Sequence, residues 1–379
     1  MDFDLTQEQE MAQKLYRAFA EKEVKPLAHA IDEEERFPVE TVEKMGRLGF
    51  LGIPIPREYG GQGCDNLTYA MCVEELSRVC ATTGTIVSAH TSLACAPLLD
   101  FGTPAQKEKY LIPLAKGEKL GAFALTEPNA GCDAAGQQTR AVRDGDSYIL
   151  NGTKVFITNA EAADIYLVFA MTDKSKGTRG ISAFVVEKDF PGFSIGKKEK
   201  KMGIRASATC ELIFRDCRVP AANLMGQEGR GFEYAMKTLD GGRIGIASQA
   251  VGIAQGALNE TLRHVKERKQ FGKPLAAFQN TQFQIADMVP RVDAARLLVL
   301  RAAVAKDTGK PYSAIAAMAK LFASETAMAV TTKCVQLYGG YGYMRDYPLE
   351  RMMRDAKITE IYEGTSEVQR MVISAHLLR

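Results

Sequence analysis

The sequence predicts an α+β fold that is mainly helical and has three parts along the chain. These are an N-terminal helical domain over 1–120, a middle antiparallel β domain over 121–220 and a C-terminal four-helix bundle over 221–379. Runs rich in β-branched and aromatic residues occur mainly between about 120 and 220, and long segments with helical apolar spacing lie on both sides. With 379 residues, of which 46% are hydrophobic, the chain can bury a large core.

The first part reads as a set of helices. Thr6 and Gln9 have the spacing of a capping box, and Met11, Leu15 and Phe19 recur at helical spacing behind it. Proline and glycine residues then divide this part into several helices.

The middle part reads as a small, mostly antiparallel sheet. Strand-forming runs lie at 147–150, 154–158, 165–169 and 181–186. Pairs such as Asp144-Gly145 and Asn151-Gly152 are typical of the turns that join antiparallel strands.

The last part is rich in Ala, Leu and Met after Val219-Pro220. Helical periodicity predicts long helices over 230–266, 280–307, 312–338 and 366–378. Antiparallel packing of four such helices gives a bundle.

Composition excludes several classes of protein. There are 48 Lys and Arg against 46 Asp and Glu, so the net charge of +2 gives no general attraction to nucleic acid or to an anionic membrane. No stretch approaches the roughly 20 uncharged apolar residues of a membrane span, and residues 1–6 lack the features of a secretory signal. The eight cysteines form no CxxC pair, so we expect no metal site and a reducing, cytoplasmic location.

Four segments could hold a ligand, although each has a simpler structural explanation. The loop 125–133 could offer backbone N–H groups, and 156–159 places an aromatic ring and a hydroxyl on one face of a strand. The cationic turn 268–274 could meet a phosphate or complement a helix dipole. The glycines of 336–342 allow close backbone approach or end a helix. No GxGxxG or P-loop pattern follows a strand, so a dinucleotide would have to be held in another way.

Glu363 is the candidate base. It lies in a turn before a helix whose Ser366 and Gln369 have capping-box spacing, and Gly364 gives this turn conformational freedom. The neighbouring Ile361 and Tyr362 favour partial desolvation, which would raise the carboxyl pKa above about 4.3 and make it a better proton acceptor. The alternative is a solvated surface glutamate.

Together, these five segments resemble the acyl-CoA dehydrogenase family, in this order and over nearly the whole chain, and most closely its bacterial short-chain, butyryl-CoA type. The resemblance implies FAD as the cofactor, bound between the β and C-terminal domains. The flavin and thioester would contact Phe123, Leu125, Thr126, Gly131 and Cys132, and the isoalloxazine and ribityl would contact Phe156, Ile157 and Thr158. The pyrophosphate and adenosine, partly across a subunit interface, would contact Arg268, Phe271, Gln279, Gln336, Gly339 and Gly340, with Thr365 and Glu367 at the remaining FAD positions.

The resemblance also implies the reaction. Glu363 would remove the proton α to the thioester carbonyl while hydride leaves the β carbon for flavin N5, giving a trans-2-enoyl-CoA. The backbone N–H of the base and a ribityl hydroxyl would polarise the carbonyl. Branched-chain and long-chain relatives carry the base on the first long C-terminal helix, but position 242 is Gly here, which leaves Glu363 as the candidate.

Substrate contacts follow in the same way, with Asp240 and Arg243 matching the family's Asp-x-x-Arg at the mouth of the active site. Their alternative is an ordinary ion pair at i, i+3, worth about 0.2–0.5 kcal/mol. The implied substrate-binding residues are Cys132, Thr91, Leu239, Asp240, Arg243, Tyr362 and Gly364. The implied partners are an acyl-CoA thioester and an electron-transferring flavoprotein, and the implied assembly is a homotetramer.

Two departures leave the substrate open. Cys132 stands where relatives usually have Ser or Thr, and Phe156 where many have Trp. Thr91 beside the acyl pocket keeps a cyclic or unsaturated acyl group possible, so an alicyclic acyl-CoA dehydrogenase is the main alternative. An acyl-CoA oxidase that uses oxygen and a helical scaffold protein that has lost the flavin are the others.

Overall fold

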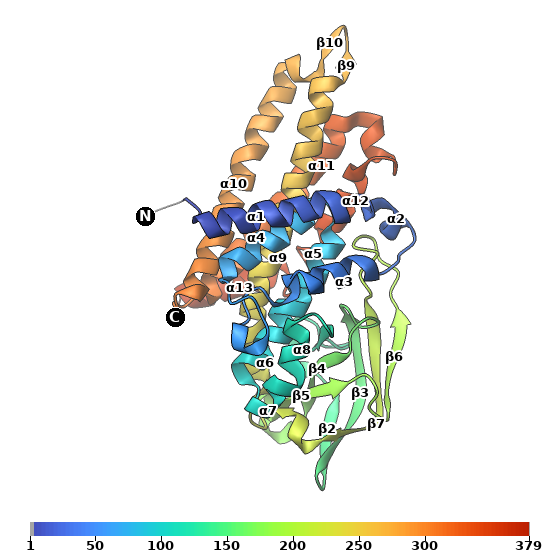
Figure 1. Ribbon diagram of the computed structural model, residues 1–379, viewed down its shortest axis with the longest axis vertical. Coiled ribbons are helices and arrows are strands. Elements are labelled where there is room, and N and C mark those ends of the chain that lie inside the picture. Colours follow the sequence, from blue (N-terminus) through green and yellow to red (C-terminus); the bar gives the residue numbers. More distant parts are fainter. Residues whose placement is uncertain (1–3, 379) are drawn as a thin grey trace.

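The computed structural model describes residues 4–378 and confirms the predicted fold class, with helices on either side of a sheet in the sequence (Figure 1). Residues 1–3, part of the segment judged to lack a secretory signal, lie outside this description.

The N-terminal part is a cluster of short helices, of which α4 and α5 are almost entirely buried. The predicted capping box is present, because the Thr6 hydroxyl accepts from Gln9 N at 3.2 Å and Gln9 Oε1 accepts from Thr6 N at 3.0 Å. The α-helices are α1 Gln7–Phe19, α2 Ala28–Glu33, α3 Val39–Arg47, α4 Asn66–Ser77, α5 Ala81–Ser88, α6 Ala96–Phe101, α7 Pro104–Gln106 and α8 Ile112–Ala115. π-helical turns η1 Ala20–Val24, η4 Ala89–Cys95 and η5 Lys107–Leu111, and 3₁₀ turns η2 Phe50–Gly52 and η3 Arg57–Tyr59, join them.

The middle part is one sheet in the order β6-β7-β3-β2-β4-β5-β8, with β1 beside β4. Its strands are β1 Gly121–Ala124, β2 Arg140–Asp144, β3 Ser147–Ile157, β4 Ile165–Met171, β5 Ile181–Glu187, β6 Phe193–Lys198, β7 Cys210–Pro220 and β8 Leu224–Met225, with 3₁₀ turns η6 Ala134–Gly136, η7 Lys174–Gly180 and η8 Ala221–Asn223. The pairing is mostly antiparallel, as predicted, but β4 runs parallel to β1 and, at one residue pair, to β2. The turn signals could not show this, because they report only on neighbours in sequence. The boundaries near 120 and 220 remain our proposal.

The C-terminal part consists of helices. Those predicted over 230–266, 280–307, 312–338 and 366–378 are found with ends that lie within a residue or two of the prediction, whereas the shorter helix over 348–358 was not predicted. The helices are α9 Gly231–Glu267, α10 Gln279–Asp307, α11 Ser313–Tyr338, α12 Pro348–Ile358 and α13 Ser366–Leu377, with η9 Leu275–Ala277 and η10 Gly339–Tyr343. A small hairpin, β9 Lys269–Gln270 and β10 Lys273–Pro274, joins α9 to α10 and lies at the far end of these helices from the sheet (Figure 1).

One segment, Ser313–Tyr343, is long and apolar enough to cross a membrane by length and composition alone. It contains α11, which packs against α9, α10, α12 and α13 and buries a row of alanines against them. Its apolar character therefore has a sufficient explanation in the core of the C-terminal bundle.

Candidate active site

Glu363 occupies a strained turn between α12 and α13. Its φ is +51°, and Gly364 follows at +91°, so two successive residues have left-handed backbone conformations. Such a conformation costs a non-glycine residue about 1–3 kcal/mol unless its surroundings hold it. The turn is held by Gln369, whose Nε2 donates to the carbonyls of Glu363 at 3.2 Å and Gly364 at 2.8 Å.

The helix after this turn starts differently from the prediction. The residue that caps α13 is Thr365, whose hydroxyl accepts from Val368 N at 3.4 Å. Ser366 is the first helical residue, and its buried hydroxyl has no hydrogen-bond partner among the described residues. The predicted capping box of Ser366 and Gln369 was therefore wrong. The cap lies one residue earlier, and the Gln369 side chain donates to the carbonyls of the turn instead.

The Glu363 side chain reaches α9 at Gly242. A Cβ at position 242 would lie 2.1 Å from Glu363 Oε2 and 2.8 Å from Leu93 Cδ2. Non-bonded contacts this short do not occur, so only glycine leaves room here for the carboxylate. The absence of a side chain at 242 thus serves the placement of Glu363 itself.

This carboxyl is poised to take up a proton. Its Oε2 is buried and accepts no hydrogen bond from the described residues. Burial raises the pKa of Glu363 from 4.5 to about 7, and the positive charges of Lys320 and Arg243 oppose the rise. The carboxyl is desolvated as the sequence predicted, and its Oε2 lies against Gly242 of α9.

Asp240 and Arg243 lie two residues before and one residue after Gly242 on α9, and they form the ion pair that their spacing allows. Asp240 also accepts from the Ser313 hydroxyl at 2.8 Å. Arg243 is 5% exposed, and its Nε has no partner among the described residues. Arg243 is therefore buried and its partner Asp240 is half-buried, which distinguishes this ion pair from one on the open surface.

The loop after β1 is tied to β3 by Lys154. The Lys154 ammonium is fully buried and donates to Leu125 O at 3.0 Å, to Glu127 at 2.7 Å and to Gln137 Oε1 at 3.1 Å. Glu127 in turn accepts from two backbone N–H groups at the other end of the loop, those of residues 138 and 139. One buried ion pair thus fixes both ends of the loop 125–139 against β3.

The segment after Lys154 presents an aromatic ring to solvent. Phe156 has a φ of +59° and is 63% exposed, whereas Ile157 is buried and Thr158 is half-buried. The prediction that Phe156 and Thr158 share one face assumed a regular strand, but β3 shifts register between Lys154 and Ile157 and ends at Ile157. The outward direction of Phe156 is therefore due to a local irregularity, not to strand pleating.

The remaining predicted cofactor residues lie at the hairpin and at the end of α11. Phe271, with a φ of +52°, is 93% exposed at the tip of the hairpin, and Arg268 packs over the Tyr341 ring at 5.4 Å. Gln279 begins α10, Gln336 is exposed on the last turn of α11, and a Cβ at Gly339 or Gly340 would meet nothing within 4 Å. The two helix-end glycines therefore leave an open backbone surface.

Comparison with known proteins agrees with this geometry over the full chain. Three family models match: acyl-CoA dehydrogenase N-terminal domain at residues 6–118, middle domain at 122–217 and C-terminal domain at 229–378. The chain is 62% identical over 379 residues, covering 100% of both chains, to the short-chain specific acyl-CoA dehydrogenase of Clostridium acetobutylicum. The chain belongs to the acyl-CoA dehydrogenase family.

Solved structures show the same fold. Butyryl-CoA dehydrogenase from Megasphaera elsdenii superposes with a TM-score of 0.99 at 54% identity, with 100% of both chains covered. A chain solved in a study of the electron transferring flavoprotein of Acidaminococcus fermentans gives a TM-score of 0.99 at 56% identity, again with 100% of both chains covered.

FAD is the cofactor of this acyl-CoA dehydrogenase, and the residues present fit it. The open backbone at Gly339 and Gly340 and the exposed rings of Phe156 and Phe271 are features that a bound ring system or nucleotide would cover. All four residues were singled out by resemblance, and their exposure is what the structure adds.

Other predicted site residues lie as follows. Thr91 on η4 is buried, and its hydroxyl donates to Leu51 O at 3.3 Å. Cys132 is an exposed free cysteine, and its thiol is among the groups that act on the Lys320 ammonium. The predicted binding roles otherwise stay predictions for Phe123, Leu125, Thr126, Gly131, Leu239, Tyr362 and Glu367.

Sequence reasoning missed three residues of this region, namely Lys154, Lys320 and Leu93. Both lysines are fully buried, which their apolar neighbours at helical or strand spacing could have suggested. Leu93 carries no such signal, because an apolar residue on a buried helix is ordinary.

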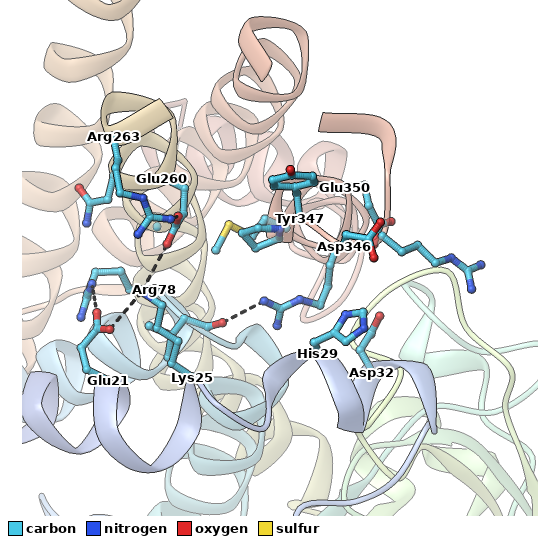
Figure 2. Close-up of a pocket in the computed structure, with 17 residues that line it drawn as sticks. Glu21, Lys25, His29, Asp32, Arg78, Glu260, Arg263, Asp346, Tyr347 and Glu350 are labelled. Carbon is cyan, nitrogen blue, oxygen red and sulfur yellow. Dashed lines mark hydrogen bonds and ion pairs between the residues drawn. The ribbon is translucent and has the colours of Figure 1, made fainter. Parts of the chain in front are cut away.

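A separate cavity of about 310 Å³ lies between the N-terminal helices and α9 and α12 (Figure 2). Its walls hold charges of both signs that pair with each other, as in Lys25 with Glu21 and Glu260, and Arg78 with Glu21. None of the predicted site residues lines it. These mutual pairs give the cavity no preference for a ligand of either sign.

Proposed function

We propose that this acyl-CoA dehydrogenase oxidises a short-chain acyl-CoA of the butyryl-CoA type to the trans-2-enoyl-CoA, with Glu363 as the base. The observation that carries the proposal is the Glu363 carboxylate, which is desolvated, has a raised pKa of about 7 and keeps Oε2 unpaired beside Gly242. A general base with a pKa near the working pH combines basicity with a useful ionised fraction.

The turn also offers a donor for the substrate carbonyl. Among the described residues, no acceptor takes the backbone N–H of Glu363, because the backbone bonds of the turn involve Tyr362 N and Ser366 N instead. This N–H is free to polarise the thioester carbonyl, which would make the α proton more acidic. The base and the polarising donor would then belong to one residue, whose conformation is fixed by Gln369.

FAD, when bound, supplies the oxidant that accepts the hydride from the β carbon. The chain's own part is to hold FAD between the loop 125–139, the segment 156–158 and, from another subunit, the hairpin and the end of α11. In one chain the hairpin lies far from the sheet, at the opposite end of α9 and α10 (Figure 1). This separation supports a site completed by a second copy, and we propose a homotetramer.

The CoA end would lie outside the base. A cavity of about 650 Å³ is lined by Asp240, Ser313 and the cationic side chains of Arg301 and Lys310. Because Asp240 is two residues before Gly242 on α9, this cavity is a suitable place for a phosphate-bearing chain that leaves the active site. The direct electron acceptor that we propose is an electron-transferring flavoprotein, as the resemblance implied.

The acyl group would be short and linear. Leu93 fills the space beside Gly242, and a Cβ at Gly245, one turn further along α9, would meet the hydroxyls of Ser88 at 2.3 Å and Tyr69 at 2.6 Å. Side chains thus close the region beyond the base. The Thr91 hydroxyl that had suggested a cyclic substrate is bonded to Leu51 O, so no observation favours an alicyclic acyl-CoA.

The test is anaerobic mixing of the FAD-loaded enzyme with butyryl-CoA, octanoyl-CoA and cyclohexanecarbonyl-CoA, followed by flavin bleaching. We expect the fastest bleaching with butyryl-CoA. Glu363→Gln should bind FAD and the thioester but not bleach, because the amide keeps the shape and lacks basicity. Bleaching by this variant at the parent rate would remove Glu363 from its role.

A further inference from the structure

Lys320 is a buried ammonium on α11, beneath the turn that carries Glu363. The side chain is 0% exposed, and its Nζ donates to Gly364 O at 2.8 Å. Its helical neighbours at 316, 317, 319 and 323 are fully buried alanines, so the packing of α11 has no need of a charge at this position. Burial of an ammonium is costly, and here it lowers the pKa of Lys320 to about 8.

The acceptor of this hydrogen bond is the residue that follows the base. Gly364 O receives both Lys320 Nζ and Gln369 Nε2, each at 2.8 Å. The two donors come from different helices, α11 and α13, and meet at a turn where Glu363 and Gly364 both have a positive φ. A left-handed glutamate persists only when such contacts determine its backbone.

Lys320 and Arg243 are the two cations near Glu363, and they differ in whether a carboxylate pairs with them. Arg243, from α9, is already paired with Asp240. Lys320 has no carboxylate within 4.0 Å in the part of the chain that the structure describes, so its charge is not cancelled locally.

The groups whose charges act on Glu363 are these two cations, while Tyr69 from α4 and Tyr362 from the same turn face it as neutral phenols. Cys132, from the loop after β1, and Glu360 act on Lys320.

We propose that Lys320 is a positioning residue for the reaction, which anchors the turn of the base through Gly364 O and supplies the uncompensated positive charge that keeps Glu363 ionised. This inference rests on the proposed role of Glu363. A neutral residue at 320 would leave the carboxylate with only the already paired Arg243 nearby. The base would then be protonated over more of the working pH range.

The test is the pH dependence of flavin bleaching by butyryl-CoA in the FAD-loaded enzyme, measured by rapid anaerobic mixing. Lys320→Met removes the charge and the donor while keeping a chain of similar length. We expect the midpoint of the rise in rate to move up by about one pH unit from about 7, which makes the rate at pH 7 about fivefold lower. Lys320→Arg keeps the charge and should keep the midpoint.

Two further variants separate the charge from other effects. Lys320→Gln keeps a hydrogen-bond donor but no charge, so it should shift the midpoint as Lys320→Met does. It replaces Lys320→Met in the test if that variant fails to hold FAD. Lys306→Met is a matched control, because Lys306 is a half-buried lysine of the C-terminal domain whose charge faces Asp100 and Asp307. Its midpoint should stay that of the parent.

An unchanged midpoint in both neutral Lys320 variants would overturn the inference, even if their rates fell. A purely structural lysine would lower FAD content or rate at every pH by the same factor. Failure of the proposed function looks different, since Glu363→Gln would then bleach at the parent rate. The two outcomes are distinguished within one set of measurements.

Discussion

Gly242→Ala should disable the base, Glu363, without disturbing α9, the helix that carries the substitution. The ideal Cβ would lie 2.1 Å from Glu363 Oε2, whereas real Cβ contacts essentially never fall below 3.0 Å. The carboxylate must therefore move by at least 3.0 − 2.1 = 0.9 Å. A misplacement of about 1 Å at a reacting group can cost about 10²-fold in rate, so we expect a loss of this order.

Gly241→Ala is the matched control. At this position the Cβ would meet only the flexible end of Lys306, with Nζ at 3.1 Å and Cε at 3.9 Å, and the Tyr312 hydroxyl at 3.9 Å. Both substitutions remove a glycine from the interior of α9, which favours the helix by about 1 kcal/mol. Any effect of helix propensity is thus shared by the two variants.

The assay is flavin bleaching by butyryl-CoA under anaerobic conditions, with FAD content and thioester affinity measured beside it. Gly242→Ala should retain FAD and bleach about 100-fold more slowly. Gly241→Ala should bleach close to the parent rate. Equal rates for the two variants would refute the reasoning, because the Glu363 oxygen at Gly242 would then not be the one that reacts.

Other predictions follow from the same contacts. Because the pKa of Glu363 is raised to about 7 from 4.5, its protonated form stabilises the folded state below pH 4.5, and this stabilisation is lost as the pH rises through 7. The free energy of unfolding of Glu363→Gln minus that of the parent should therefore be larger at pH 8 than at pH 4.5. At about 1.4 kcal/mol per pH unit, the increase is up to about 3 kcal/mol, and urea denaturation at both pH values checks this. Lys154→Met removes the only ion-pair partner that the described residues give the buried Glu127, so FAD should be released on gel filtration, and the double variant with Glu127→Gln should recover part of it. Phe271→Ala should lower FAD affinity, measured by fluorescence of released flavin, while leaving the thermal stability of the apoprotein unchanged, because the ring is 93% exposed in one chain. An FAD affinity equal to that of the parent would contradict the shared site.

The sequence predicted most of the fold because the relevant signals are periodic. The ends of α9, α10, α11 and α13 lie within a residue or two of those that apolar spacing predicted. The parallel neighbours of β4 were missed, since turn chemistry reports only local connections. The register shift in β3 was missed for a similar reason, because nothing in the residue types marks an irregularity at Phe156.

The sequence named residues for the proposed site but not their geometry. Resemblance selected Glu363 and Gly242 together, yet only the structure places the carboxylate where a Cβ would be. Lys320 resembles an ordinary helix-forming residue in sequence, and its burial depends on α13 and the preceding turn packing over α11. Contacts between residues 44 apart in sequence have no local signature.

Backbone strain connects these observations. Seven described residues other than glycine have a positive φ, and three of them, Phe156, Phe271 and Glu363, are residues predicted to contact the cofactor or the substrate. Strained conformations survive where other contacts hold them, and Glu363 has two such contacts, from Lys320 and Gln369 to the adjoining carbonyls. Phe271 stands at the exposed tip of a short hairpin, where its ring lies 6.2 Å from that of Phe278 and is otherwise 93% exposed. Further contacts that would hold Phe271 would come from a cofactor shared with a second subunit, as we propose above.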